Sequence, residues 1–347
     1  MQNSKNRLFY IDNAKVIACF SVVIYHFVSS LIESSLIEKN LINDSFLLWL
    51  NSFQVIIFFF CSGFLFNKYG KNDTLSSWRT NTLKKGLNLL VPYLIFSFFT
   101  IILKKFGSNY VNNNVENPLY SFFISPIAPY WFLITLFIFF LIPIQNDNEL
   151  NLLNILISII FVLFYGFNSF FSIINLPSII SFLISNYIWF ILGWFFSKYN
   201  LVEKIELNRI SYFILLIFFS MLLILFYLKF ELFTICFLKP ILGFCIALCI
   251  LMIFYHYFNS RSWWLSKYYF YVFLLHTIFA AGFRIVLFKF GVFSLYIHLF
   301  GLVVSTCGPL FTGIICKRII YLDIIFYPTT TIHIIRKRRE KNNEINI

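Results

Sequence analysis

The sequence predicts an all-α, polytopic membrane protein with about ten transmembrane helices and both termini in the cytoplasm. The first observation is composition: 60% of the 347 residues are hydrophobic, 12% are charged, and 49 are Phe. A chain with so few polar residues has too little polar surface to coat a water-soluble globule. The second observation is that apolar runs recur along almost the whole length, which indicates that a bilayer is the solvent.

Ten apolar runs are long enough to cross a hydrocarbon core of about 30 Å, which takes about 17–25 residues. In chain order, the predicted spans are 14–32, 46–66, 87–103, 130–146, 150–167, 177–197, 210–228, 232–255, 268–288 and 293–316. The fourth and fifth are the least well separated, because only Gln145 to Glu149 lies between them and both are near the short limit.

The third observation is the distribution of Lys and Arg, which sets the orientation. With the N-terminus in the cytoplasm, the inner segments hold twenty of these residues and the outer segments five. This asymmetry follows the positive-inside rule and favours a cytoplasmic location for both termini. The net charge of +13 is therefore mainly a topology signal, with some attraction to anionic membrane lipids, and we do not expect nucleic-acid binding.

A different kind of segment follows the last span. Residues 319–335 are apolar but interrupted by Asp323 and Pro328, and they lead into the basic run 336–339. Such a segment is typical of a chain lying along the inner membrane interface. The predicted organisation is a transmembrane domain over residues 1–318 and an interfacial segment with a basic cytoplasmic tail over 319–347.

The first span pairs Lys15 with His26 on one helix face. Eleven residues of helix correspond to a rotation of about 1100°, which leaves the two side chains roughly 20° apart, and to about 16 Å along the axis. A cation at the membrane surface is thus aligned with an imidazole near the middle of the bilayer. This arrangement suits chemistry that begins on one side of a membrane and ends deeper in it.

Ionisable residues within a bilayer are candidates for function, because burying them is costly. Five lie in the predicted spans: His26, Lys239, His276, Arg284 and His298. No Asp or Glu lies mid-helix, whereas proton- and sodium-coupled transporters usually need buried carboxylates. A neutral histidine can accept a proton from a hydroxyl group. The seven cysteines form no CxxC and no Cys/His cluster, so we expect no metal.

Two early motifs resemble those of the membrane acyltransferase-3 family. Asp12-Asn-Ala-Lys15 followed by His26 is similar to the family's first helix, where an acid precedes a basic residue by three and a histidine follows eleven later. The segment Phe58-Phe-Phe-Cys-Ser-Gly-Phe64 resembles the family's second-helix signature of aromatics followed by Ser-Gly-Phe.

Three later motifs occur in the same order as in that family. Lys84-Lys85 with Pro92-Tyr93 is similar to a basic segment before a Pro-Tyr helix start, and Trp131-Phe-Leu133 and Phe273-Leu-Leu-His276 also have counterparts. The chain departs from the pattern at three positions, where the family usually has Arg, a second Arg and Tyr: Lys15, Asn88 and Phe273. Lys15 keeps the charge but lacks the bidentate fork of Arg.

The resemblance implies transfer of an acyl group, most often acetyl from cytoplasmic acetyl-CoA, to a sugar hydroxyl of a surface glycan or its lipid-linked precursor. It implies His26 as the general base, which takes a proton either from the acceptor hydroxyl directly or during formation of an acyl intermediate. Lys15, Asp12 and His276 belong to the same catalytic set, with Asp12 orienting Lys15 or capping the helix. Lys15 is also expected, with Arg79, Lys84 and Lys85, to attract the phosphates of coenzyme A. Trp131 and Ser62 are expected to contact substrate, unless Trp131 lies in the aromatic belt and Ser62 only permits close helix packing.

The resemblance also implies a multi-pass protein of a bacterial inner membrane. Many family members carry a fused extracytoplasmic esterase-like domain, which this chain lacks, so we expect the acceptor to be presented at the membrane or by a separate partner protein. Two alternatives remain. One is a non-enzymatic transporter of a glycan or lipid-linked sugar, and the other is an enzyme with a different acyl donor, such as succinyl-CoA.

Overall fold

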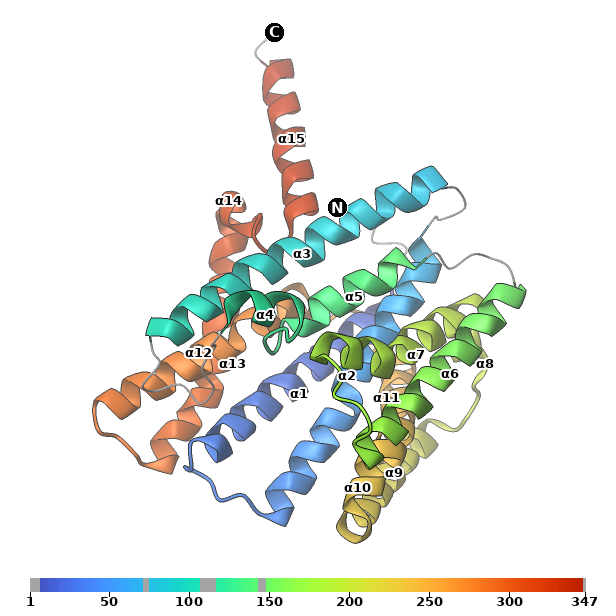
Figure 1. Ribbon diagram of the computed structural model, residues 1–347. Coiled ribbons are helices and arrows are strands. Elements are labelled where there is room, and N and C mark those ends of the chain that lie inside the picture. Colours follow the sequence, from blue (N-terminus) through green and yellow to red (C-terminus); the bar gives the residue numbers. More distant parts are fainter. Residues whose placement is uncertain (1–6, 71–74, 107–116, 143–147, 346–347) are drawn as a thin grey trace. The chain divides into compact units, whose positions relative to one another are not determined.

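The computed structural model describes residues 7–70, 75–106, 117–142 and 148–345, and these residues form helices and connecting segments without a strand (Figure 1). They fall into two compact units, Met1–Gly70 with Ile144–Tyr269 and Lys71–Pro143 with Phe270–Ile347. We call them unit 1 and unit 2 and describe each by itself.

Unit 1 contains the first two long helices and the middle part of the chain. Its elements are α1 (Phe9–Glu33), α2 (Leu41–Tyr69), α6 (Asn148–Phe171), α7 (Ser178–Lys198), α8 (Leu201–Lys204), α9 (Arg209–Lys229), α10 (Glu231–Phe233), the π-helical segment η2 (Thr234–Leu238), α11 (Lys239–Tyr257) and the 3₁₀ segment η3 (Trp264–Lys267). Helix α2 packs against α1, α7, α9 and α11 and is the centre of the unit.

Unit 2 contains a long early helix and the C-terminal part of the chain. Its elements are α3 (Leu75–Phe106), α4 (Pro118–Phe123), α5 (Trp131–Leu141), α12 (Tyr269–Lys289, of which Tyr269 belongs to unit 1), α13 (Leu295–Arg318), α14 (Ile320–Asp323) and α15 (Pro328–Ile345). Helix α3 packs against α4, α5 and α15.

Nine helical stretches in the described residues are long and apolar enough to cross a membrane. They correspond to nine of the ten predicted spans and confirm an all-α, polytopic membrane protein. The prediction for 130–146 is wrong in length, because α5 has 11 residues, or about 16 Å of helix, and ends at Leu141. Ile142 is extended, as expected for a residue before a proline, while residues 143–147 lie outside the described part of the chain.

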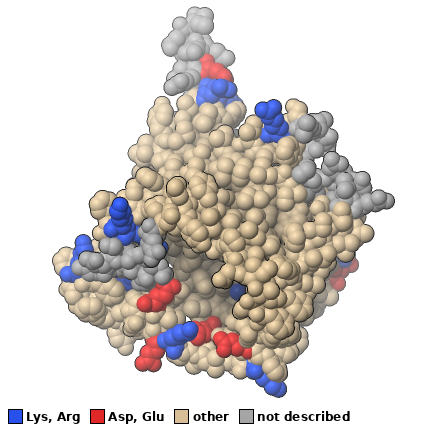
Figure 2. All heavy atoms as spheres, viewed as in Figure 1, with Lys and Arg blue, Asp and Glu red and all other residues tan. Residues whose placement is uncertain are grey.

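The surface of the spanning helices matches a lipid environment. In α9 exposed large side chains recur every three or four residues along one face: Ile210, Ile214, Ile217, Met221, Leu225 and Leu228. Such a stripe would be unfavourable in water over this length. Figure 2 shows an exterior made mostly of uncharged residues, with the visible Lys, Arg, Asp and Glu side chains gathered toward its edges.

Three glycines bring the backbone of α2 into direct contact with its neighbours. A Cβ at Gly63 would lie 1.9 Å from the carbonyl oxygen of Phe190 in α7, and one at Gly193 would lie 2.0 Å from that of Phe60. A Cβ at Gly243 in α11 would lie 2.2 Å from the carbonyl oxygen of Ser52. In a membrane the hydrophobic effect does not drive helices together, because lipid tails are as apolar as the side chains. Helices associate instead through close backbone packing, which small residues permit.

We therefore expect Gly63→Ala to destabilise the protein by at least about 1–3 kcal/mol, because the clash is with backbone and the helices have to separate. Gly282→Ala, in α12, is the matched control, since a Cβ there would meet nothing within 4 Å. The measurement is the thermal unfolding midpoint in detergent. Equal midpoints for the two variants would contradict this packing.

Candidate active site

One face of α1 carries a line of polar side chains along the span. Lys15, Cys19, His26 and Glu33 fall within about 40° of one another on the helix, and Ser29 lies at its edge. Lys15 and His26 are half-buried, Cys19 is fully buried, and Glu33 at the far end is exposed and accepts a hydrogen bond from Ser29 at 3.3 Å. The Tyr25 ring lies edge-on to the imidazole of His26, 5.3 Å between ring centroids. The predicted alignment of Lys15 and His26 is thus present within a single continuous helix.

Tyr269 lies at the inner end of this face. Its phenol interacts electrostatically with Lys15, Asp12, Cys19 and Cys61, and its backbone oxygen accepts a hydrogen bond from the Cys19 thiol at 3.3 Å. The Phe58 ring of α2 stacks on it at 6.5 Å. A phenol in the electrostatic field of a lysine ammonium offers a hydrogen-bond donor for a bound carbonyl or phosphate. Sequence reasoning missed Tyr269, because nothing in its local pattern links it to α1.

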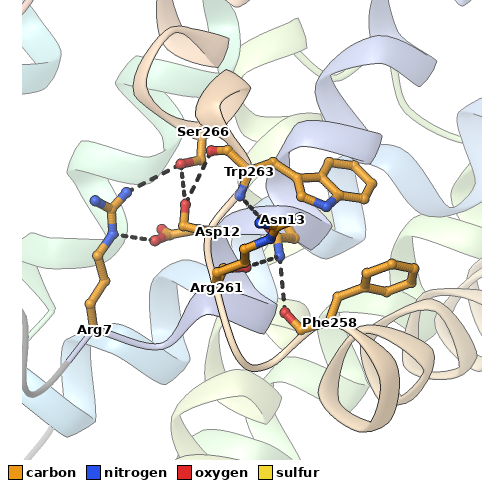
Figure 3. A network of polar contacts seen from close by, with 8 residues as sticks. Arg7, Asp12, Asn13, Phe258, Arg261, Trp263 and Ser266 are labelled. Atoms are coloured by element: carbon orange, nitrogen blue, oxygen red, sulfur yellow. Dashed lines mark hydrogen bonds and ion pairs between the residues drawn. The ribbon is translucent and has the colours of Figure 1, made fainter.

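Asn13 fixes the inner end of α1 to the connection between α11 and η3 (Figure 3). Its amide nitrogen donates to the backbone oxygens of Phe258 and Arg261, both at 3.1 Å, and its amide oxygen accepts from the Trp263 N–H at 2.8 Å. Asn13 is fully buried, so these three bonds satisfy most of what an amide can make. They fix the rotation of α1 and therefore the direction of the face that carries Lys15 and His26.

The ion-pair partner of Asp12 is Arg7, and the prediction that Asp12 orients Lys15 stays a prediction. Its carboxylate forms an ion pair with Arg7 at 2.5 Å, and Arg7 also donates to Ser266 at 3.4 Å (Figure 3). The prediction that Asp12 caps the helix is wrong: the N-cap is Leu8, and the Asp12 N–H already bonds to the Leu8 oxygen within the first turn. The acid in that turn stabilises the positive end of the helix and neutralises Arg7.

Ser62 lies on α2, next to Gly63 at the crossing with α7. Its hydroxyl donates to the Phe58 oxygen one turn earlier at 2.7 Å, and the side chain is half-buried. Such back-bonding is the usual state of a serine inside a helix. The predicted substrate contact of Ser62 stays a prediction.

The other predicted site residues belong to unit 2. His276 on α12 is buried, with 1% of its surface exposed, and its Nδ1 lies 3.1 Å from the Val272 oxygen and 2.9 Å from the Phe273 oxygen. Because carbonyl oxygens only accept hydrogen bonds, Nδ1 must carry the proton. Nε2 then holds the lone pair, so His276 has the tautomer of a base.

Trp131 begins α5, next to a residue that joins three helices. The fully buried Tyr130 donates its hydroxyl to the Leu274 oxygen at 3.0 Å and lies 3.1 Å from the Thr100 hydroxyl. Leu274 is two residues before His276 on α12, while Thr100 is on α3. Tyr130 therefore holds the start of α5 against both helices and fixes the position of Trp131 relative to His276.

The basic residues Arg79, Lys84 and Lys85 all lie on α3 and are exposed. The Lys85 ammonium lies over the Phe140 ring, 4.9 Å from its centroid. Helix α3 runs without interruption from Leu75 and contains Pro92, so these residues and the Pro92-Tyr93 motif lie on one helix, which begins earlier than the predicted span 87–103. Their spacing is therefore helical, which places Lys84 and Lys85 about 100° apart around α3.

A family model described as an acyltransferase domain, acyltransferase-3, matches residues 8–314. The chain belongs to the membrane acyltransferase-3 family. No curated protein and no solved structure matches it. The family assigns the protein to the membrane acyltransferases, and the match includes α1, α2, α3, α5 and α12 with all the predicted site residues.

Family membership also explains which site residues could be found in advance. The residues of this membrane acyltransferase that sequence reasoning identified lie in short local motifs, whereas Asn13 and Tyr269 act through residues about 250 positions away. Among the described residues, no three His, Cys, Asp or Glu side chains come together as a metal site would require.

We expect Asn13→Asp to lower stability by about 2–4 kcal/mol, because a carboxylate cannot donate to the oxygens of Phe258 and Arg261 and leaves them unpaired. Asn200→Asp is a matched control, since Asn200 lies in a turn and makes no side-chain cap bond. The measurement is thermal unfolding in detergent with activity followed in parallel. An Asn13→Asp protein as stable as this control would show that the three bonds do not fix α1.

Proposed function

We propose that this acyltransferase moves an acetyl group from cytoplasmic acetyl-CoA to a sugar hydroxyl of a cell-surface glycan or its lipid-linked precursor. The observation that carries the proposal is the polar face of α1, where Lys15 and His26 are aligned along the helix in a member of the acyltransferase-3 family. The face begins at a cation suited to a phosphorylated donor and continues to a base suited to a hydroxyl acceptor.

His26 acts as the general base. It takes the proton of the acceptor hydroxyl while the sugar oxygen attacks the thioester carbonyl. Collapse of the tetrahedral adduct breaks the carbon–sulfur bond, and the proton passes from His26 to the departing coenzyme A thiolate. The products are an O-acetyl sugar and free coenzyme A, and a positioned base is typically worth about 10²–10⁴-fold in rate.

The donor binds through its charge at the inner end. Coenzyme A carries several phosphates, and Lys15 supplies positive charge for them on the face of α1. Tyr269, whose phenol interacts electrostatically with Lys15, supplies a hydrogen-bond donor for the same ligand. The thioester then extends along α1 toward His26, which lies about 16 Å further along the helix.

The acceptor is met by aromatic and neutral polar groups. Trp131 offers an indole face of the kind that stacks on sugar rings, and His276 offers Nε2 as an acceptor for a hydroxyl. A lipid-linked glycan suits a site within the membrane, because its lipid holds the sugar at the bilayer. We place the protein in a bacterial inner membrane, with both termini in the cytoplasm, on the distribution of Lys and Arg.

The test is the O-acetyl methyl signal in the proton NMR spectrum of surface polysaccharide from cells with wild-type protein or His26→Ala at matched membrane abundance. We expect the signal to disappear in His26→Ala with no change in polysaccharide yield. The control is His256→Gln, outside the α1 face, which keeps an N–H for its contact with the Tyr212 hydroxyl and should retain the signal.

Two results would overturn the proposal. Acetylation that persists without His26 would remove the general base from the mechanism. Loss of the polysaccharide itself would favour a transporter of a glycan or lipid-linked sugar.

A further inference from the structure

The segment after the family match packs on unit 2 and continues into a basic helix. The match ends at residue 314, within α13. Beyond it, Phe326 is buried, with its ring 4.5 Å from that of Tyr271 in α12 and 5.1 Å from that of Phe96 in α3. The Tyr327 ring lies 5.3 Å from that of Phe270. Phe326 is thus part of the core of unit 2, and the prediction that 319–335 lies along the inner membrane interface stays a prediction.

A carboxylate holds this segment in place. Asp323 accepts a hydrogen bond from the phenol of the fully buried Tyr271 through one oxygen. Its other oxygen lies 3.4 Å from the hydroxyl of Thr331, which is also fully buried, in the first turn of α15. Asp323 therefore joins α12, α14 and α15, and its negative charge is engaged at this contact.

Asn88 holds the start of α15 against α3. Its side-chain oxygen accepts from both the N–H and the hydroxyl of Thr329, at 3.1 and 2.9 Å. This contact occurs one turn after Lys84 and Lys85 on α3. We call the contacts of Asp323 and Asn88 the α15 clasp.

The helices that the clasp joins, together with α13, carry exposed cations. They are Arg79, Lys84 and Lys85 on α3, Lys317 and Arg318 at the end of α13, and Arg336 and Lys337 on α15. Against them, the acids of unit 2 whose side chains are described are Asp323, engaged in the clasp, and Glu340, and neither forms an ion pair within the described residues. These helices carry a large excess of positive charge.

The spacing of these cations suits a ligand with several phosphates. Measured along each helix from the contact of Asn88 with Thr329, Lys84 and Lys85 lie about 5–6 Å away, and Arg336 and Lys337 about 11–12 Å away. Lys and Arg side chains extend several ångströms from the helix, and Arg can bind a phosphate through two hydrogen bonds.

We propose that α15, held by the clasp, forms together with α3 the site that binds the phosphates of the nucleotide part of the acyl donor, with Arg336 and Lys337 as ligands. The inference rests on the proposed function for the identity of the donor. Anionic lipid headgroups offer the same phosphate chemistry from a second source, which the experiment separates.

The experiment measures binding of coenzyme A, by isothermal titration calorimetry, to the full-length protein in nanodiscs of phosphatidylcholine. Arg336→Gln/Lys337→Gln should raise the dissociation constant about 3- to 30-fold, as expected for the loss of two partly exposed charge contacts. Lys104→Gln/Lys105→Gln, an equal charge change at the other end of α3, should leave it unchanged. Pantetheine, which lacks the phosphates, should bind equally to all three proteins.

The clasp is tested without altering a charge. Thr329→Val removes the hydroxyl that bonds to Asn88, and it should weaken coenzyme A binding in the same direction as loss of the two cations. Thr330→Val, at an exposed neighbouring position, should not. All variants are compared at equal thermal stability, so that a misfolded protein is not read as weak binding.

Three results would overturn the inference. One is an unchanged dissociation constant for Arg336→Gln/Lys337→Gln. The second comes from repeating the titration in nanodiscs that also contain phosphatidylglycerol. If the double variant differs from wild type only in those nanodiscs, the cations bind lipid headgroups. The third is a wild-type protein that binds no coenzyme A, which would also remove the donor from the proposed function. The first result, found together with unchanged acetyl transfer, leaves the proposed function standing.

Discussion

The three hydrogen bonds of Asn13 are the constraint on which the site in unit 1 depends. They tie the inner end of α1 to the backbone of the α11–η3 connection, and each partner is a main-chain group whose position is fixed by its own helix or turn. A rotation of α1 would break all three and leave a buried amide without partners, at a cost of several kcal/mol. The direction of the face that carries Lys15, Cys19 and His26 follows from this contact.

The second constraint is the packing of α2 against α7 and α11 through backbone rather than side chains. Gly63, Gly193 and Gly243 remove the Cβ atoms that would keep these helices apart. Inside a lipid bilayer the hydrophobic effect does not hold helices together. Dispersion between the closely spaced backbones takes that role. Since α1 packs on α2, this group of helices supports the face that carries Lys15 and His26, and the Phe58 ring of α2 stacks on Tyr269.

Much of the architecture could be predicted, because apolar runs of spanning length are a local signal. The pairing of Lys15 with His26 was also predictable, since a helix turns by a fixed angle per residue. The length of α5 could not be predicted, because its apolar run continues past Pro143 in the sequence. Only the extended conformation of Ile142 shows that the helix has ended. Asn13, Tyr269 and Asp323 were missed for one physical reason. Each acts through tertiary contacts, and a single sequence contains no periodicity that pairs such distant positions.

The most direct test of the account is transfer in a purified system. Protein in vesicles that also contain lipid-linked glycan is supplied with acetyl-CoA labelled in the acetyl group, and label on the glycan is followed over time for wild type and His26→Gln. The account predicts label on sugar hydroxyls with the wild-type protein and a rate lowered at least about 100-fold by His26→Gln, with donor binding retained. Equal rates for the two proteins would contradict a mechanism in which His26 is the general base.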